Sequence, residues 1–248
     1  MAAGNVILRE EHVFEKINKY IDPKDTMFHG TEKKYFEIGA SALNVTRSAL
    51  AAAQIPESEI RNILDYGCGY GRVLRWFSGA FEHAKILGMD RDGAALASIE
   101  ANLSVETRLV DLELKHDLNS SFELIWMGSL FSHLPEVELL RLLKYLSRHL
   151  SKNGLLVFTT LGPFAEGRIR SGKKLYGLGS EEAGRLLLDY RNSGFGFGNY
   201  PKQVNYGIAL VHPFWIMGKF DEHGLNPVFF AQKGWDHHQD VFAANLCY

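Results

Sequence analysis

The chain has 248 residues and a net charge of −2, with 27 Lys and Arg side chains against 29 Asp and Glu. This length suits one α/β core with a further segment over a binding site, and the balanced charge disfavours binding to a polyanion such as nucleic acid. Two cysteines, Cys68 and Cys247, make neither a disulfide framework nor a zinc site, and no apolar run is long enough to span a bilayer, so we expect a soluble cytoplasmic protein without a membrane partner.

Two helices are predicted before the core, over residues 10–21 and 31–53, because apolar residues recur there at helical spacing. A break that contains Pro23 separates them. We therefore expect residues 1–56 to form an N-terminal helical segment and residues 57–248 to form the main domain.

Strands and helices then alternate, which is typical of a parallel sheet covered by helices on both faces. The predicted strands are 61–66, 85–89, 105–110, 122–127 and 154–160, and the predicted helices are 72–81, 92–103 and 135–150. The last helix has the clearest pattern: Pro135 lies near its start, leucines line one face, and Asn153-Gly154 is expected to stop it.

The alternation lapses after the fifth predicted strand. Residues 162–207 contain a basic stretch, a helix predicted over 180–192 and a run of glycines and aromatic residues. Long irregular segments in compact domains are usually lids or binding loops, so we interpret this segment as an insertion that covers the substrate. The chain is then predicted to continue with a helix over 213–223, a strand over 226–232, a turn over 233–239 and a last strand over 240–247.

A glycine-rich turn, Asp65-Tyr66-Gly67-Cys68-Gly69-Tyr70-Gly71, joins the first predicted strand to the following helix. Glycine permits positive φ and lets a ligand contact the main chain. The second predicted strand leads to Asp90, whose carboxylate could bind a ribose. The third small residue of the dinucleotide fingerprint is replaced by Arg72. The pattern therefore indicates a nucleoside site and disfavours a nicotinamide dinucleotide.

The pattern Asp-x-Gly-x-Gly-x-Gly, followed by Asp90 and Asp111 after the next two strands, resembles the class I S-adenosylmethionine-dependent methyltransferases. The resemblance covers roughly residues 60–161. It implies a Rossmann-like, seven-stranded, mostly parallel sheet, with S-adenosylmethionine as cofactor. The cofactor-binding residues that it implies are Asp65, Gly67, Gly69, Gly71, Asp90, Asp111, Leu112 and Gly128. Two of them also have a structural interpretation: Asp90 could cap the next helix, and Asp111 could belong to a solvated turn.

Histidines are the candidates for a catalytic base, which methyl transfer to a hydroxyl requires. His133 follows the fourth predicted strand, and ligands of open parallel sheets bind beyond the carboxyl ends of the strands. The resemblance implies an antiparallel last strand, which would bring His237, His238 and Asp240 to the same edge. The alternatives are a His133 packed among loops and a polar hairpin cap at residues 237–240. A metal site is disfavoured, since ligand spacing is lacking.

The predicted insertion and its end supply candidate substrate contacts. Four aromatic residues could stack on a sugar ring or a flat acceptor, namely Phe195, Phe197, Tyr200 and Tyr206. His212 could face the acceptor. The alternatives are that the aromatic residues bury the loop itself and that His212 caps a helix. Four basic residues could bind an anionic group or simply be solvated; they are Arg168, Arg170, Lys173 and Lys174.

The resemblance implies an enzyme that transfers a methyl group to a small-molecule acceptor. The Asn/Asp-Pro-Pro-aromatic motif associated with amine methylation in this family is absent after the fourth strand, where Met127-Gly128-Ser129-Leu130 stands. An oxygen acceptor on a sugar or secondary metabolite is therefore favoured. The alternatives are a protein or RNA acceptor that contacts the basic stretch, and a non-catalytic module that binds S-adenosylmethionine.

Overall fold

The computed structural model describes residues 10–111, 113–115 and 117–247. The chain divides into two compact units. The N-terminal unit comprises Met1–Met127 and Leu150–Leu155, and the C-terminal unit comprises Gly128–His149 and Leu156–Tyr248. The predicted boundary at residue 56 stays a prediction.

Seven strands form one sheet in the order β3-β2-β1-β4-β5-β9-β8. The strands are β1 (Asn62–Tyr66), β2 (Lys85–Asp90), β3 (Glu106–Leu109), β4 (Phe122–Met127), β5 (Leu150–Thr160), β8 (Leu225–Trp235) and β9 (Gln239–Leu246). The first four pair in parallel, with Leu64 of β1 opposite Leu87 of β2 and Ile125 of β4. The last strand pairs antiparallel with β5. The predicted Rossmann-like, mostly parallel sheet is therefore confirmed.

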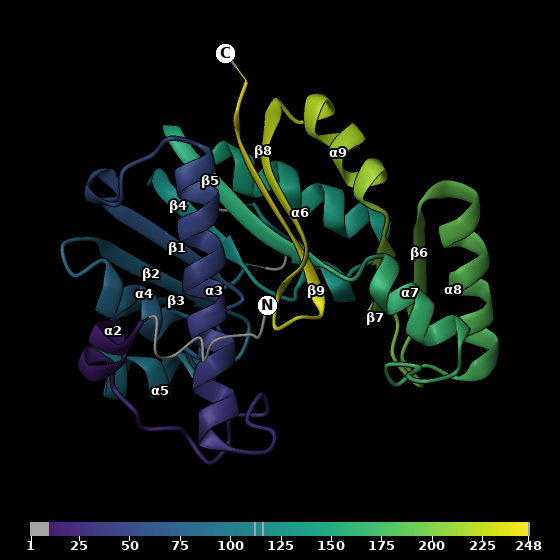
Figure 1. The fold of residues 1–248 in the computed structure, drawn as a ribbon, viewed down its shortest axis with the longest axis horizontal. Helices are drawn as coiled ribbons and strands as arrows, with labels where there is room; N and C mark the ends of the chain where they lie inside the picture. The colour runs from purple at the N-terminus through teal and green to yellow at the C-terminus, as the bar shows by residue number, and fades with distance from the viewer. Residues whose placement is uncertain (1–9, 112, 116, 248) are drawn as a thin grey trace. The chain divides into compact units, whose positions relative to one another are not determined.

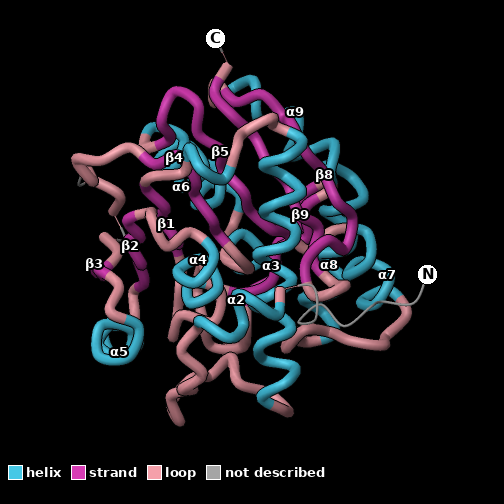
Figure 2. The backbone as a smooth tube through the Cα atoms, turned by 60° about the vertical axis from the view of Figure 1, so that its left-hand side comes forward, coloured by secondary structure: helices cyan, strands magenta, loops and turns pink. Residues whose placement is uncertain are grey.

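The helices of the N-terminal unit follow the predicted order. They are α2 (Glu11–Lys16), α3 (Glu32–Ala52), the short η1 (Glu57–Glu59), α4 (Leu74–Ala80) and α5 (Gly93–Leu103). Both α2 and α3 pack against α4 (Figure 2). The first leading helix is shorter than predicted and ends at Lys16. Beyond it, the Arg75 guanidinium donates hydrogen bonds to the carbonyl oxygens of Asn18 and Tyr20, at 3.0 and 2.7 Å, which fixes this segment outside the helix.

The C-terminal unit contains more regular structure than predicted. Its helices are η2 (Phe131–His133), α6 (Glu136–Arg148), α7 (Pro163–Arg170), α8 (Ser180–Ser193) and α9 (Pro213–Glu222). A separate hairpin of β6 (Phe195–Asn199) and β7 (Gly207–Val211) lies beside α8 (Figure 1). The segment 162–207 is therefore not irregular. Its residues Ile169 and Leu186 belong to an apolar cluster that also includes Leu161, directly before the segment.

Close backbone approaches explain why glycines occupy this hairpin. A Cβ atom at Gly196 would lie 2.2 Å from the carbonyl oxygen of Leu186, and one at Gly207 would lie 1.8 Å from the carbonyl oxygen of Gly198. No larger residue fits at either position. The run of glycines that suggested a loop is thus what lets β6 pack against α8 and β7.

Two further predicted boundaries are wrong. Residues Asn153 and Gly154 lie inside β5 and do not stop the preceding helix, which ends at Arg148. A Cβ atom at Gly154 would lie 2.6 Å from the carbonyl oxygen of Phe122, so the glycine serves a close approach within the sheet. The predicted turn over 233–239 is also too long, because β8 runs through an irregularity to Trp235, which pairs with Gln239.

Among the described residues, every helix is too short or too polar to cross a bilayer.

Candidate functional site

The glycine-rich turn of the N-terminal unit combines positive φ with open space. The φ angles of Gly67, Gly69 and Gly71 are +81°, +51° and +79°, and the N–H groups of Gly67 and Cys68 donate to the carbonyl oxygen of Met89 at the end of β2. A Cβ atom at Gly71 would lie 2.6 Å from Leu103, whereas one at Gly69 would meet nothing within 4 Å. Gly71 therefore serves packing against α5, and Gly69 leaves room for a ligand.

Asp90 connects the end of β2 to this turn. Its Oδ2 atom accepts a 2.8 Å hydrogen bond from the N–H of Gly69, and its Oδ1 atom accepts one of 2.9 Å from the N–H of Asp92. The cap of α5 is Asp92, whose carboxylate accepts from the N–H groups of Ala94 and Ala95. The alternative that Asp90 caps this helix is therefore wrong.

The hydrogen bonds of Asp92 at the start of α5 are expected to stabilise the protein. Asp92→Ala should lower the free energy of unfolding by about 1 kcal/mol, since it leaves two N–H groups of α5 without their acceptor. Chemical denaturation monitored by circular dichroism measures this change. Asp92→Asn keeps a side-chain oxygen and is the control; an equal loss in both variants would contradict the capping role.

Asp65 is a buried carboxyl group beside the turn, with 2% of its surface exposed. Its Oδ2 atom accepts no hydrogen bond from any residue that the structure describes. Burial, with a further contribution from the charge of Asp90, raises the pKa of Asp65 to about 8. Unsatisfied buried acceptors are costly, so this oxygen fits a site that receives a hydrogen-bond donor from a ligand.

The raised pKa of Asp65 predicts a pH dependence of stability. The ordinary pKa of an aspartate is 3.8, and that of folded Asp65 is about 8, so between these values the folded state binds more protons than the unfolded state. The free energy of unfolding should then fall as the pH rises from about 4 to about 8. Asp65→Asn should remove this decrease in the free energy of unfolding with pH. Urea denaturation of both proteins across this range tests it, and parallel curves would contradict the assignment.

The carboxylate of Asp111 organises its own loop. It accepts hydrogen bonds from the N–H groups of Glu113 and Lys115, at 3.0 and 2.9 Å. The turn interpretation of Asp111 is thus confirmed, and its predicted contact with adenine stays a prediction. Leu112 lies outside the described residues.

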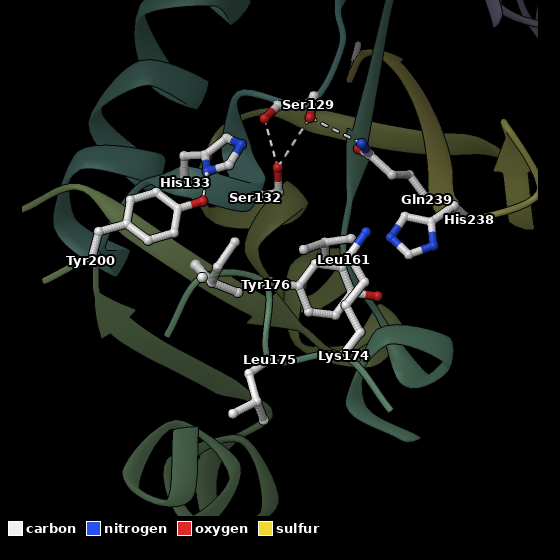
Figure 3. A pocket seen from close by; sticks show the side chains of 12 residues that line it. Ser129, Ser132, His133, Leu161, Lys174, Leu175, Tyr176, Tyr200, His238 and Gln239 are labelled. Carbon is white, nitrogen blue, oxygen red and sulfur yellow. Dashed lines mark hydrogen bonds between the residues drawn. The ribbon is translucent and has the colours of Figure 1, made fainter. Parts of the chain in front are cut away.

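A cavity of about 550 Å³ lies within the C-terminal unit (Figure 3). The residues that line it are Ser129, Ser132, His133, Leu161, Lys174, Leu175, Tyr176, Gly177, Tyr200, Ile208, His238 and Gln239. Figure 3 shows His133 and Tyr200 on one side of the pocket and Lys174, Tyr176 and His238 on the other. The pocket therefore offers polar groups at two ends, with apolar side chains among them.

A closed hydrogen-bond network holds Ser129 at the pocket. Its N–H donates to Thr159 Oγ1 at 2.7 Å, Thr159 Oγ1 donates to Gln239 Oε1 at 2.6 Å, and Gln239 Nε2 donates to Ser129 Oγ at 2.9 Å. Ser132 Oγ donates to the carbonyl oxygen of Ser129 at 2.6 Å. Ser129 has φ of +63°, an unusual backbone conformation that this network stabilises. The predicted cofactor residue Gly128 directly precedes it.

The imidazole of His133 is held through Nδ1, which lies 2.8 Å from the carbonyl oxygen of Gly207. A carbonyl oxygen only accepts hydrogen bonds, so Nδ1 carries the proton and Nε2 keeps its lone pair. Burial lowers the pKa of His133, although the bond to Gly207 opposes this. His133 is therefore a neutral, oriented base at neutral pH.

Two tyrosines surround this histidine. The Tyr206 ring stacks on His133 with centroids 5.4 Å apart, and the Tyr200 hydroxyl lies 3.2 Å from Nδ1. Because Nδ1 is the proton donor, its N–H forms a bifurcated hydrogen bond to the Gly207 carbonyl oxygen and the Tyr200 hydroxyl oxygen. The hydroxyl hydrogen of Tyr200 then remains available to a ligand. Tyr200, a predicted substrate residue, thus lines the pocket.

The predicted tetrad 237–240 is divided in the structure. His238 lines the pocket, between the rings of Phe164 and Tyr176, each with its centroid 5.5 Å away. His237 is exposed, with φ of +53°. Asp240 is fully buried, and its Oδ1 atom accepts a hydrogen bond from the N–H of Lys233. One oxygen of the Asp240 carboxylate is therefore bonded to the backbone of β8, and Oδ2 has no partner among the described residues, while His238 lies between aromatic rings.

The remaining predicted substrate residues have structural contacts. His212 caps α9 through Nδ1, which accepts from the N–H of Phe214 at 3.3 Å, so the capping alternative is confirmed. Phe195 is buried and packs against Trp215, with ring centroids 4.9 Å apart. Phe197 is partly buried in β6 and does not line the pocket.

Sequence reasoning missed the pocket roles of Ser132, Tyr176 and Gln239. The clearest available signal was the sequence Ser129-Leu130-Phe131-Ser132-His133, which places two hydroxyls just before the candidate base. No group of three or more His, Cys, Asp or Glu side chains within the described part of the chain is arranged to hold a metal ion.

Comparison with known proteins identifies a methyltransferase domain. The family model of that description matches residues 63–154. A trans-aconitate 2-methyltransferase from Deinococcus radiodurans is 32% identical over 104 residues, which are 42% of this chain and 39% of that protein. The match therefore spans about two-fifths of the length of this curated relative.

Solved structures of low sequence identity share the fold. An amino pentose methyltransferase from Micromonospora echinaspora, solved with S-adenosylmethionine bound, has 17% identity and a TM-score of 0.57, covering 84% of this chain and 90% of that one. Magnesium protoporphyrin IX methyltransferase from Synechocystis PCC 6803 has 12% identity and a TM-score of 0.59, covering 97% and 95%. At these identities the likeness shows the fold.

Proposed function

We propose that this chain, whose residues 63–154 match a methyltransferase domain, is a class I S-adenosylmethionine-dependent methyltransferase that methylates an oxygen atom of a small-molecule acceptor. The acceptor class is a sugar or secondary metabolite. The trans-aconitate and amino pentose enzymes that resemble this chain are named for small acceptors, which supports the proposal. The observation that carries it is His133, a pocket histidine whose Nδ1 is bound to Gly207 and whose Nε2 is left as a base.

The donor is assigned to the glycine-rich turn of the N-terminal unit. Gly69 leaves open space at a positive φ, and the buried Oδ2 atom of Asp65 has no donor among the described residues. These two features fit the methionine part of S-adenosylmethionine, whose amino group would donate to Asp65. Asp90 would bind the ribose hydroxyls while it keeps its bond to Gly69. Bound S-adenosylmethionine supplies a methyl group on a sulfonium, which is electrophilic.

The acceptor is assigned to the pocket of the C-terminal unit. Nε2 of His133 would take the proton from the acceptor hydroxyl, so that the hydroxyl oxygen can accept the methyl group that bound S-adenosylmethionine would supply. The hydroxyls of Ser129 and Tyr200 would orient the acceptor within the pocket, because both line the pocket and have fixed positions. The reaction yields a methyl ether or ester and S-adenosylhomocysteine, and the proton leaves through His133.

A methylation assay tests this function. The full chain is incubated with methyl-labelled S-adenosylmethionine and with sugars, phenols and hydroxy acids, with a protein extract and total RNA as parallel arms. We expect label in small molecules, at oxygen. Labelled protein or RNA would instead favour the macromolecular alternative. Donor binding by calorimetry without transfer to any arm would favour a non-catalytic binding module.

A further inference from the structure

The Lys174 end of the pocket has cations without acidic partners. Lys174 lines the pocket, with Nζ 4.8 Å from the centroid of the Tyr176 ring. Arg168 and Lys233 both lie over the Phe164 ring, with Cζ at 5.8 Å and Nζ at 4.7 Å from its centroid. None of these three cations forms an ion pair with a carboxylate among the described residues. Aromatic rings, not acids, are their neighbours.

The positive charges of Lys174 and Arg168 act on His238, which lines the pocket. Burial, and then the charges of Lys174 and Arg168, lower the pKa of this histidine, while Asp236 opposes them. The rings that carry the cations are also the rings that contact His238, namely Phe164 and Tyr176. The wall formed by Lys174, Tyr176 and His238 is therefore electropositive.

Two nearby carboxylates, those of Glu166 and Asp240, form no ion pair with Lys174 or Arg168. Glu166 pairs with Arg170 at 2.9 Å and lies 3.9 Å from Arg191. Asp240 is fully buried; its Oδ1 atom accepts a hydrogen bond from the N–H of Lys233, and its Oδ2 atom has no partner among the described residues. Because neither carboxylate pairs with these cations, the positive charge at His238 is offset within the described part of the unit only in part, by Asp236.

Two buried hydrogen-bond donors near this wall have no acceptor among the described residues. The hydroxyl of Tyr176 and Nε of Arg168 are both inaccessible to solvent and lack partners among the described residues. The charge of Arg168 acts on the Tyr176 hydroxyl. Unsatisfied donors next to an unpaired cation are costly unless a ligand supplies acceptor oxygens.

We propose that the acceptor carries an anionic group, a carboxylate or phosphate, that binds Lys174 at this wall while its hydroxyl lies at His133. The inference rests on the proposed function, because it specifies the acceptor class of the same pocket. Lys174 supplies the direct charge, Arg168 strengthens the field behind it, and Tyr176 and His238 complete the wall. A neutral sugar would leave these cations without a partner.

Histidine ring signals observed by nuclear magnetic resonance test the anion site without requiring turnover. The full chain with labelled histidines is titrated with inorganic phosphate, with citrate and with glucose, at an ionic strength held constant with chloride. The His238 signals are assigned with His238→Gln. We expect saturable shifts of His238 with phosphate or citrate and none with glucose. Phosphate alone would identify a phosphoryl group, and citrate alone a carboxylate.

Two lysine variants form the matched pair. Lys174→Met keeps the apolar stem and should weaken anion binding about tenfold, whereas Lys173→Met removes the exposed neighbour that does not line the pocket and should leave binding unchanged. Equal effects of the two variants, an equal response to glucose, or no saturation with either anion would overturn the inference.

Calorimetry with S-adenosylhomocysteine on the same samples separates the two proposals. If the chain does not bind this product, the proposed methyltransferase function is wrong, whether or not the His238 signals shift with anions. A chain that binds it but shows no anion response at His238 contradicts only the anionic acceptor.

Discussion

His133→Asn is expected to lower kcat by about 10²–10⁴-fold, the usual contribution of a general base. The asparagine amide can still donate to the carbonyl oxygen of Gly207, as Nδ1 of His133 does at 2.8 Å. It has no atom in the place of Nε2, so the variant removes the base and keeps the anchoring hydrogen bond. Steady-state kinetics with the acceptor found in the methylation assay measure the loss. Binding of S-adenosylhomocysteine should be unchanged.

The matched control is His223→Asn. Nδ1 of His223 also bonds a backbone carbonyl, that of Lys219, at 2.9 Å, but this histidine follows α9 and does not line the pocket. It should leave kcat unchanged.

The wild-type rate should fall as the pH drops through the lowered pKa of His133, because the protonated ring cannot accept a proton. A His133→Asn enzyme with the full rate and the same acid limb would rule out His133 as the base.

The N-terminal half of the sheet could be predicted from sequence because its signals are local. A strand, three alternate glycines and a helix stand next to one another in the chain, and the acidic residues Asp90 and Asp111 follow the next strands. The leucine face of α6 is equally local, and it is buried as expected. Such patterns need no knowledge of distant contacts.

The pocket could not be predicted in the same way, because its geometry joins distant segments. Ser129, Thr159 and Gln239 form one hydrogen-bond network although they belong to three separate parts of the chain. The partner that orients His133 is a backbone carbonyl, and a carbonyl has no sequence signature. The partner of Asp240 is likewise a backbone group, the N–H of Lys233, which has no sequence signature either.

The second large effect is expected at the glycine-rich turn: Gly69→Val should weaken S-adenosylmethionine binding by about 100-fold or more. Gly69 has φ of +51°, and a Cβ atom there would meet no protein atom within 4 Å, so a valine side chain would project into unoccupied space. If the donor lies across this turn, valine takes its place. The N–H of Gly69 would also lose its alignment with Asp90, which it contacts at 2.8 Å. Calorimetry with S-adenosylmethionine measures the loss.

Backbone strain alone must be separated from loss of the ligand site, since a β-branched residue at positive φ costs on the order of 1–2 kcal/mol. Gly224 provides the control: its φ is +65°, and a Cβ atom there also meets nothing within 4 Å. Gly224→Val should therefore lower the free energy of unfolding about as much as Gly69→Val and leave donor affinity intact. If both variants lose donor affinity equally, the loss reflects general destabilisation. If neither variant loses donor affinity, the donor does not lie across the turn. The assignment of Asp65 and Asp90 to donor binding would then also be wrong.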